Sequence, residues 1–198
     1  MAKLSRDEVV RLANEEQAKL KFALGDLTMA WADAESALYC ILRYYAGVSD
    51  PVARAIFSGS RARTMMDFIN NITHNTNAEP LRRKDLALVF AQMTAINTMR
   101  DRLTHYLSWS EVRFEEQNPQ ARWLSNADRV NRLGTEYKYS VSSKLVGEMC
   151  TDLSSICWHL LAHRDSDPFR PWAGISGKEK SYAWVYKSPP PGKRDDSD

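Results

Sequence analysis

The sequence predicts a mainly α-helical fold, an antiparallel helical bundle with a small β-hairpin insertion between its last two long helices. Three observations predict it. Long segments carry apolar residues at alternating spacings of three and four, the pattern of a helix with one buried face. Residues 107–141 instead carry aromatic and β-branched residues with partial alternation, which is typical of short strands. The chain has 198 residues, 43% of them hydrophobic and 26% charged, which suits one sizeable core.

The first long helix is predicted to begin near Ser5, because Ser5 and Glu8 have the spacing of a capping box. Gly47 is predicted to end it, since many helices end at a glycine in the left-handed conformation. Between these signals one apolar stripe runs through Leu24, Leu27, Trp31, Ala34, Leu38, Ile41 and Tyr45.

Two shorter helices and a second long helix are predicted next. Pro51 favours a helix over residues 51–57, with Asp50 as its candidate cap. A further helix carries Met65, Phe68, Ile69 and Ile72. From Leu81 the second long helix carries Leu86, Val89, Met93 and Ile96, and the same count then leads to Arg100. An arginine is therefore predicted at a seam position of this helix.

The last helix is predicted from the spacing of Met149, Leu153, Ile156 and Leu160, with Ser142 or Ser143 as its cap. Residues 1–164 would then form one domain, with the insertion at about residues 107–141. Residues 165–198 contain prolines and aromatic residues and end in a polar stretch. We expect a tail that partly covers the bundle and becomes disordered at its end.

The composition argues against several classes of protein. The net charge of +2 gives no global attraction to nucleic acid, so a basic surface would have to be local. Cys40, Cys150 and Cys157 lack the paired spacing of a disulfide framework or zinc cluster, and reduced thiols are expected. His159 and His163 are four residues apart, but without a nearby third ligand a structural role is favoured. We expect a cytoplasmic protein with no cofactor, no metal and no membrane segment.

Arg100 is the residue whose predicted position most needs an explanation, because a buried arginine is costly without a partner. Asp33 and Glu35 of the first long helix are candidate partners, and a second subunit covering the seam is the alternative. His105 follows five residues later, which on a straight helix means about 7.5 Å of rise and roughly 140° of rotation. Arg102 is closer to His105, at about 60°. The spacing alone leaves open which arginine would act with the histidine.

Arg100, the polar Asp101 and, after three more residues, His105 resemble the signature of the HEPN superfamily, in which arginine and histidine lie near the end of a late helix. The resemblance covers roughly residues 20–164. It implies a metal-independent endoribonuclease, commonly a homodimer whose motifs face one cleft that binds RNA. His105 would be the general acid or base, Arg100 would bind the phosphate, and Asp101 would orient one of them. Arg102 and Glu35 would support the site.

Weaker candidates for RNA contact lie outside the motif. Arg82 and Arg83 belong to a short basic cluster, and such clusters are most often solvated surface. Arg113 and Trp123 belong to a region that interleaves aromatics with arginines, which suits base stacking. The alternative for that region is a hairpin that packs its aromatic residues onto the bundle.

A second hypothesis for the function is a non-catalytic helical dimerisation or interaction module. It is favoured by the long stripes, the aromatic tail and two departures from the family pattern. Asp101 stands where asparagine is more familiar, and Tyr106 follows the histidine where a small residue is common. As a nuclease, the protein would suit phage defence, a toxin–antitoxin pair or a stress response, with a protein antitoxin or regulatory partner.

Overall fold

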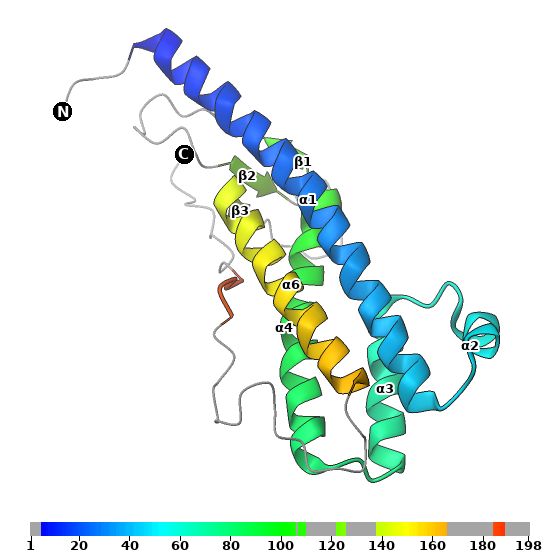
Figure 1. Ribbon diagram of the computed structural model, residues 1–198. Coiled ribbons are helices and arrows are strands. Elements are labelled where there is room, and N and C mark those ends of the chain that lie inside the picture. The colour runs from blue at the N-terminus through cyan, green and yellow to red at the C-terminus, as the bar shows by residue number, and fades with distance from the viewer. Residues whose placement is uncertain (1–4, 106, 110–121, 126–137, 166–183, 189–198) are drawn as a thin grey trace, which may run out of the picture. The chain divides into compact units, whose positions relative to one another are not determined.

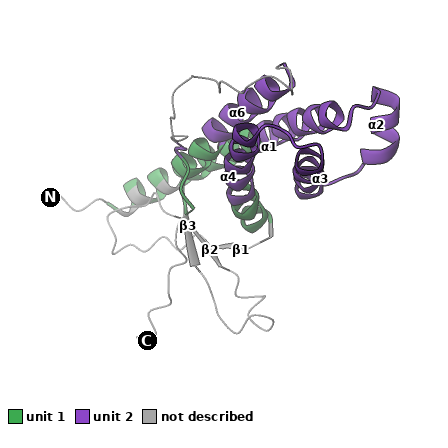
Figure 2. Ribbon diagram, turned by 90° about the horizontal axis from the view of Figure 1, so that it is seen from below, with its two compact units in different colours: residues 1–27, 96–149, 186–198 green, residues 28–95, 150–185 purple. Residues whose placement is uncertain are grey.

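The computed structural model describes residues 5–105, 107–109, 122–125, 138–165 and 184–188 of the chain (Figure 1). The fold is mainly α-helical, as predicted. Within the described residues the helices are α1 (Arg6–Ala46), α2 (Asp50–Phe57), α3 (Ala62–Asn75), α4 (Pro80–His105) and α6 (Ser143–Arg164). The chain divides into two compact units (Figure 2). Unit 1 comprises Met1–Leu27, Ile96–Met149 and Tyr186–Asp198, and unit 2 comprises Thr28–Ala95 and Cys150–Val185.

α1 begins and ends where its local signals predict. The Ser5 hydroxyl donates to Glu8 Oε2 at 2.9 Å and accepts from the Glu8 N–H at 3.3 Å, while the Ser5 N–H donates to the same carboxylate at 2.8 Å. This reciprocal capping box satisfies backbone donors that a helix start leaves without partners. At the other end Gly47 has a φ of 64°, the left-handed conformation in which glycine is favoured.

α2 and α3 follow the predicted helices, but the prediction of Asp50 as a side-chain cap is wrong. The N-cap position of α2 is Ser49, and its side chain makes no capping hydrogen bond. Asp50 instead receives Arg43 Nη1 at 2.8 Å and Arg54 Nε at 2.6 Å. These two arginines, through their hydrogen bonds, lower the pKa of Asp50 below its usual value. Two guanidinium groups outcompete the backbone N–H groups for this carboxylate.

α4 carries a buried stripe whose last members differ from the sequence count. Leu86, Val89, Met93 and Ile96 are fully buried, as predicted, but the stripe then continues through Met99, which is also fully buried. Arg100 keeps 33% of its side chain exposed. On an ideal helix the position four after Ile96 lies about 40° from it, so Arg100 still falls on the side of α4 that carries the stripe, where it is partly rather than fully buried.

α6 begins after Ser142, whose hydroxyl accepts the N–H of Leu145 at 3.2 Å. Met149, Leu153, Ile156 and Leu160 are all fully buried, as their spacing predicts. In unit 2, α4 and α6 are antiparallel, because Asp85 contacts His163 whereas Gln92, two turns later in α4, contacts Asp152, about three turns earlier in α6. These paired helices, with the second half of α1 and with α3, enclose the core of unit 2 (Figure 2).

Unit 1 contains the first part of α1, the ends of α4 and α6 nearest the strands, and the strands themselves. The strands β1 (Leu107–Trp109), β2 (Arg122–Ser125) and β3 (Lys138–Val141) pair antiparallel in the order β1-β2-β3. In the backbone register, Trp109 is paired with Trp123 in the first pair of strands, and Leu124 with Tyr139 in the second. The connections between these strands lie outside the described residues, so the extent of the predicted insertion stays a prediction.

No helix within the described ranges combines the length and the apolar character that crossing a membrane requires.

Candidate functional site

The motif residues lie at the end of α4 that belongs to unit 1. Arg100 Nη2 lies 3.3 Å from Asp101 Oδ1, and Asp101 Oδ2 accepts a hydrogen bond from Asn97 at 3.4 Å. The Thr104 hydroxyl donates to the Arg100 carbonyl at 2.8 Å. The carboxylate of Asp101 therefore lies between a guanidinium and an amide, and it is half-exposed beside a partly exposed arginine. A guanidinium in this setting can reach a solvent-borne anion while an adjacent carboxylate holds its orientation.

His105 is the last residue of α4, and its side chain lies outside the described part of the structure. The helix runs without interruption from Arg100 to His105. Their backbones are therefore separated by the helical rise of about 7.5 Å and a rotation of roughly 140°, as expected from the spacing.

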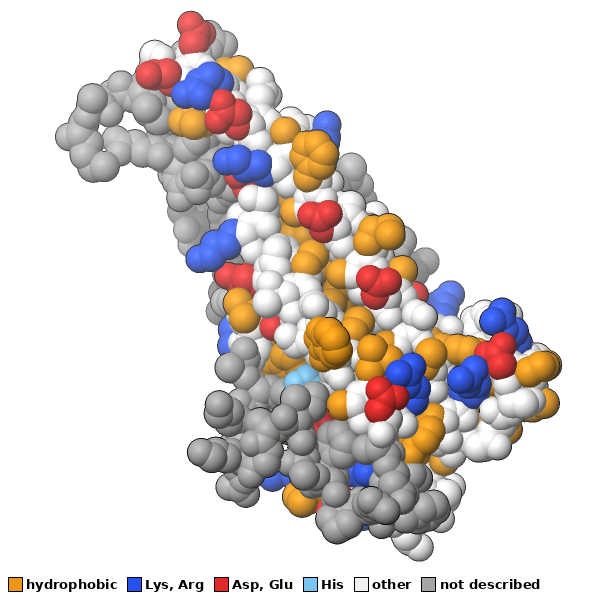
Figure 3. Space-filling model, viewed as in Figure 1, with side chains coloured by type: hydrophobic (Ala, Val, Ile, Leu, Met, Phe, Trp, Pro, Cys, Tyr) orange, Lys and Arg blue, Asp and Glu red, His pale blue; other side chains and the backbone are white. Residues whose placement is uncertain are grey.

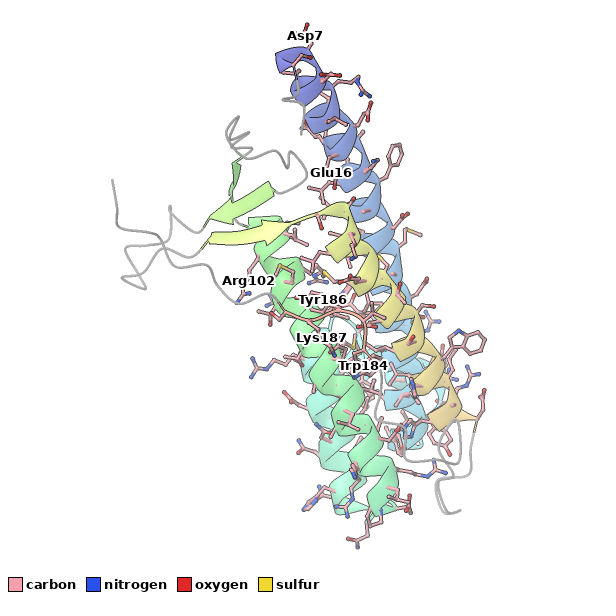
Figure 4. The ribbon with its side chains drawn as sticks, turned by 90° about the vertical axis from the view of Figure 1, so that its left-hand side faces the viewer. Asp7, Glu16, Arg102, Trp184, Tyr186 and Lys187 are labelled. Atoms are coloured by element: carbon pink, nitrogen blue, oxygen red, sulfur yellow. The ribbon has the colours of Figure 1, made fainter. Side chains whose placement is uncertain are left out.

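Arg102 is half-buried and lies beside the C-terminal segment of unit 1. Burial raises the pKa of Tyr186, and the hydrogen bond with Ser188 and the positive charge of Arg102 act in the opposite direction. Figure 4 shows Arg102 on α4 and Tyr186 on the C-terminal segment. Arg102 thus has a neighbour that no sequence spacing suggested, a fully buried tyrosine 84 positions further along the chain.

Glu35 is half-buried on α1 and belongs to unit 2, whereas Arg100 belongs to unit 1. Arg100 forms an ion pair with its neighbour Asp101. A supporting role for Glu35 stays a prediction.

Arg82 is only 1% exposed, so the prediction that it lies on a solvated surface within reach of RNA is wrong. It hydrogen-bonds the hydroxyl of Tyr45, whose pKa is raised by burial and lowered in turn by this contact. The physical reason is that the first turn of α4 in unit 2 packs against the last turns of α1 and α6. The sequence shows a basic cluster there, but only one of its arginines turns inward.

A buried polar cluster in unit 2 surrounds this arginine, and the sequence did not predict it. His163 is fully buried; its Nδ1 lies 3.2 Å from the Tyr45 hydroxyl and its Nε2 lies 2.7 Å from Asp85 Oδ2. Neighbouring His159 is half-buried, and burial lowers its pKa. In the described ranges no three histidine, cysteine or acidic side chains gather as a metal site would need. The cluster joins the ends of three helices.

Of the remaining residues predicted to contact RNA, only one has a side chain that the structure describes. Arg83 is half-buried, and its Nη1 lies 3.3 Å from Nδ1 of His74. Arg113 lies outside the described residues, and Trp123 belongs to β2 but its side chain is not described. Their contact with RNA stays a prediction.

Asp152 is a second polar residue that the sequence did not single out. The residue is 2% exposed, and both of its carboxylate oxygens accept hydrogen bonds. Oδ2 accepts from Gln92 of α4 at 2.7 Å, and Oδ1 accepts from the backbone N–H of Val185 at 2.9 Å. The available signal was its place beside Leu153, in the apolar stripe of α6, because a carboxylate there needs buried donors.

Comparison of the chain with models of protein families, with curated proteins and with solved structures gave no match.

Proposed function

We propose that the chain is a metal-independent endoribonuclease of the HEPN type. The observation that supports it best is the contact between Arg100 and Asp101 one turn before the end of α4, where His105 is the last helical residue. A partly exposed guanidinium, oriented by a carboxylate and followed by an imidazole, is a set of groups suited to phosphate chemistry.

In this proposal the ribose 2′-hydroxyl attacks the adjacent phosphorus and the bond to the 5′-oxygen of the next nucleotide breaks. His105 takes or gives the proton, since an imidazole pKa near 6.5 allows both at neutral pH. Arg100 stabilises the charge that develops on the phosphate oxygens through paired hydrogen bonds. Asp101 is a positioning residue that holds Arg100 from the side opposite the substrate.

The finer parts of the proposal are the RNA substrate and a homodimer that gathers two motifs. An antitoxin or regulatory protein would be a further partner. Each has its support in the resemblance of residues 20–164 to the family.

The test is cleavage of labelled RNA by the purified full chain in EDTA. His105→Ala and Arg100→Ala should each lower the rate about a hundredfold or more, because each removes a group used in the transition state. Matched controls are His74→Ala and Arg63→Ala, which change an exposed histidine and an exposed arginine of unit 2. Absence of cleavage by the parent chain, or unchanged cleavage by the His105 variant, would end the proposal.

A second candidate function is an interaction module without catalysis. It is supported by large apolar side chains that the described part of the chain leaves open to solvent, above all Phe22, Met29 and Trp158 at 78%, 68% and 71% exposure. Under this hypothesis His105→Ala leaves the biological effect unchanged, whereas charged substitutions on the apolar surface abolish it. A cellular assay with both kinds of variant separates the two functions.

A further inference from the structure

α1 carries a second apolar stripe on the face turned away from the core. The stripe consists of Ala18, Phe22, Gly25, Met29 and Ala32, all of them exposed. Their spacing of four, three, four and three is a seven-residue repeat, the spacing with which two helices pack lengthwise. All five lie on one uninterrupted helix, so their common face follows from helix geometry alone. Figure 3 shows apolar side chains standing along the visible face of α1 among charged ones.

The core uses the opposite face of the same helix. Leu20, Leu27, Ala34 and Ile41 recur every seven residues and are buried. The exposed stripe is therefore not a continuation of the core, and packing among the residues that the structure describes does not explain it. A surface helix that leaves a phenylalanine 78% and a methionine 68% exposed on one face, about two turns apart, is typical of an interaction surface.

Gly25 lies in the middle of the exposed stripe. A Cβ placed on it would meet nothing within 4 Å, so the fold of the single chain does not need a glycine here. Glycine in a helix interior costs about 1 kcal/mol relative to alanine. A residue without a side chain at this position is explained if another backbone or a large side chain approaches from outside.

We propose that this stripe is the contact between two copies of the chain, paired through α1 in antiparallel orientation. With the two-fold axis at the level of residue 27, each Phe22 lies against the partner's Ala32, and each Gly25 against the partner's Met29. Each of these layers then combines one large and one small side chain, the arrangement that fills a helix–helix interface without voids, and Ala18 comes level with the partner's Ser36 at each end of the contact. A closed two-fold pair also covers the whole stripe on both copies.

The charged residues beside the stripe agree with the same register. Positions flanking the apolar seam face their counterparts in an antiparallel pair, and opposite charges there set partner choice and orientation. Lys19 comes beside the partner's Asp33, and Lys21 beside the partner's Glu35, each pair occurring twice. Asp26 lies next to the axis, beside the partner's Asp26, and this is the single unfavourable pair.

A parallel pair fits the same residues less well. It would place Phe22 against the partner's Phe22, which gives a layer with two large side chains. It would place Gly25 against the partner's Gly25, which gives a layer with no side chain to fill the interface. It would also bring Asp26 beside the partner's Lys21, turning the one unfavourable charge of the antiparallel pair into a favourable one. The charge of Asp26 therefore distinguishes the two orientations.

The first experiment is sedimentation equilibrium of the full chain across a range of concentrations. We expect a monomer–dimer equilibrium, and Met29→Asp should raise the dissociation constant about a hundredfold, since it places a charge in the centre of the seam on both copies. Trp158→Ser, which changes an equally exposed apolar residue of α6, should leave the constant unchanged. Circular dichroism checks that both variants keep the parental helix content. A monomeric parent chain, or an equal effect of the two substitutions, overturns the proposal.

The second experiment fixes the orientation. Lys19→Asp and Asp33→Lys should each weaken the dimer about tenfold, and the double variant should recover the parental constant, because it restores opposite charges on both sides. Asp26→Asn should tighten the dimer. A weaker dimer in Asp26→Asn, or no recovery in the double variant, contradicts the antiparallel register.

This dimer is proposed whether or not the chain cleaves RNA. Sedimentation is measured without RNA, and cleavage is measured separately, so a monomeric protein and an inactive one are different outcomes. If both proposals hold, Met29→Asp also shows whether cleavage requires the second copy.

Discussion

His163 has no solvent contact, and both of its ring nitrogens have protein partners, Tyr45 and Asp85. An imidazole offers one donor and one acceptor when neutral, so two polar neighbours on opposite sides satisfy it without water. Removing any one of these three side chains leaves a buried polar atom of another without its hydrogen-bond partner. The free-energy penalty of that unsatisfied atom is larger than the net contribution of the hydrogen bond. These three residues come from α1, α4 and α6, so one side chain links three helices of unit 2.

We expect His163→Ala to lower the free energy of unfolding by about 2–3 kcal/mol, because Asp85 and Tyr45 lose a buried partner. His74→Ala is the matched control, since His74 is exposed at the end of α3. Urea denaturation followed by circular dichroism measures both. Equal stability of the two variants would show that the buried contacts contribute nothing.

His159 gives the stability of the fold a dependence on pH. Burial lowers its pKa from 6.5, with Asp85 acting in the opposite direction and His163 in the same direction as burial. A histidine with a lowered folded pKa binds its proton more readily in the unfolded chain, so acid favours unfolding. The free energy of unfolding should therefore fall as the pH drops below 6.5, and His159→Gln should flatten this slope. Denaturation curves at several pH values test it, and an unchanged slope in the variant would contradict it.

At the scale of single residues, the sequence predicts which apolar residues are buried, but it does not predict which charged residues are buried. Apolar stripes predicted Trp31, Leu38 and Ile156 correctly, because helix periodicity alone places them. The burial of Arg82 could not be predicted in this way. It depends on Tyr45, which is far along the chain and reaches Arg82 only after the helices pack.

α1 shows how far one element can be predicted from its own residues. Its start at the Ser5 and Glu8 capping box and its end at Gly47 depend on contacts within a few positions, and both predictions are confirmed. Its second stripe is also visible in the sequence. The residues from Leu24 to Tyr45 form a stronger pattern on another face, and only the exposure of the side chains separates a core stripe from a surface stripe.

Two glycine substitutions separate helix propensity from the proposed pairing of α1. Gly25 and Gly147 both lie inside helices with open space where a Cβ would be. Gly25→Ala and Gly147→Ala should each stabilise the isolated chain by about 0.5–1 kcal/mol. Only Gly25→Ala should weaken the dimer, since the added methyl group meets the partner's Met29. Thermal unfolding and sedimentation of both variants test this, and a dimer insensitive to Gly25→Ala would argue against close approach there.

At the scale of the whole molecule, residues 184–188 belong to the C-terminal region that the sequence predicts to be a tail. The two neighbours Val185 and Tyr186 are both anchored, Val185 by its N–H to Asp152 in unit 2 and Tyr186 by complete burial in unit 1. The predicted covering of the bundle by residues 165–198 stays a prediction. The anchor itself was not predictable, because Asp152 and Val185 are 33 positions apart and no local pattern connects them.

Tyr186→Ala should lower the free energy of unfolding by about 3 kcal/mol, because it removes a fully buried aromatic ring and leaves a cavity. Lys187→Ala, one residue further and exposed, serves as the control. Chemical denaturation of the full chain measures both. A loss no larger than that of the control would mean that the segment contributes no packing energy.

Because burial raises the pKa of Tyr186, its phenol ionises at a higher pH than a tyrosine in water. Phenolate absorbs ultraviolet light at longer wavelength than phenol, so an alkaline titration records the ionisation of this buried tyrosine without any added label. Subtracting the titration of Tyr186→Phe isolates the signal of Tyr186 from that of the other tyrosines. The chain thus carries its own optical probe for the burial of Tyr186.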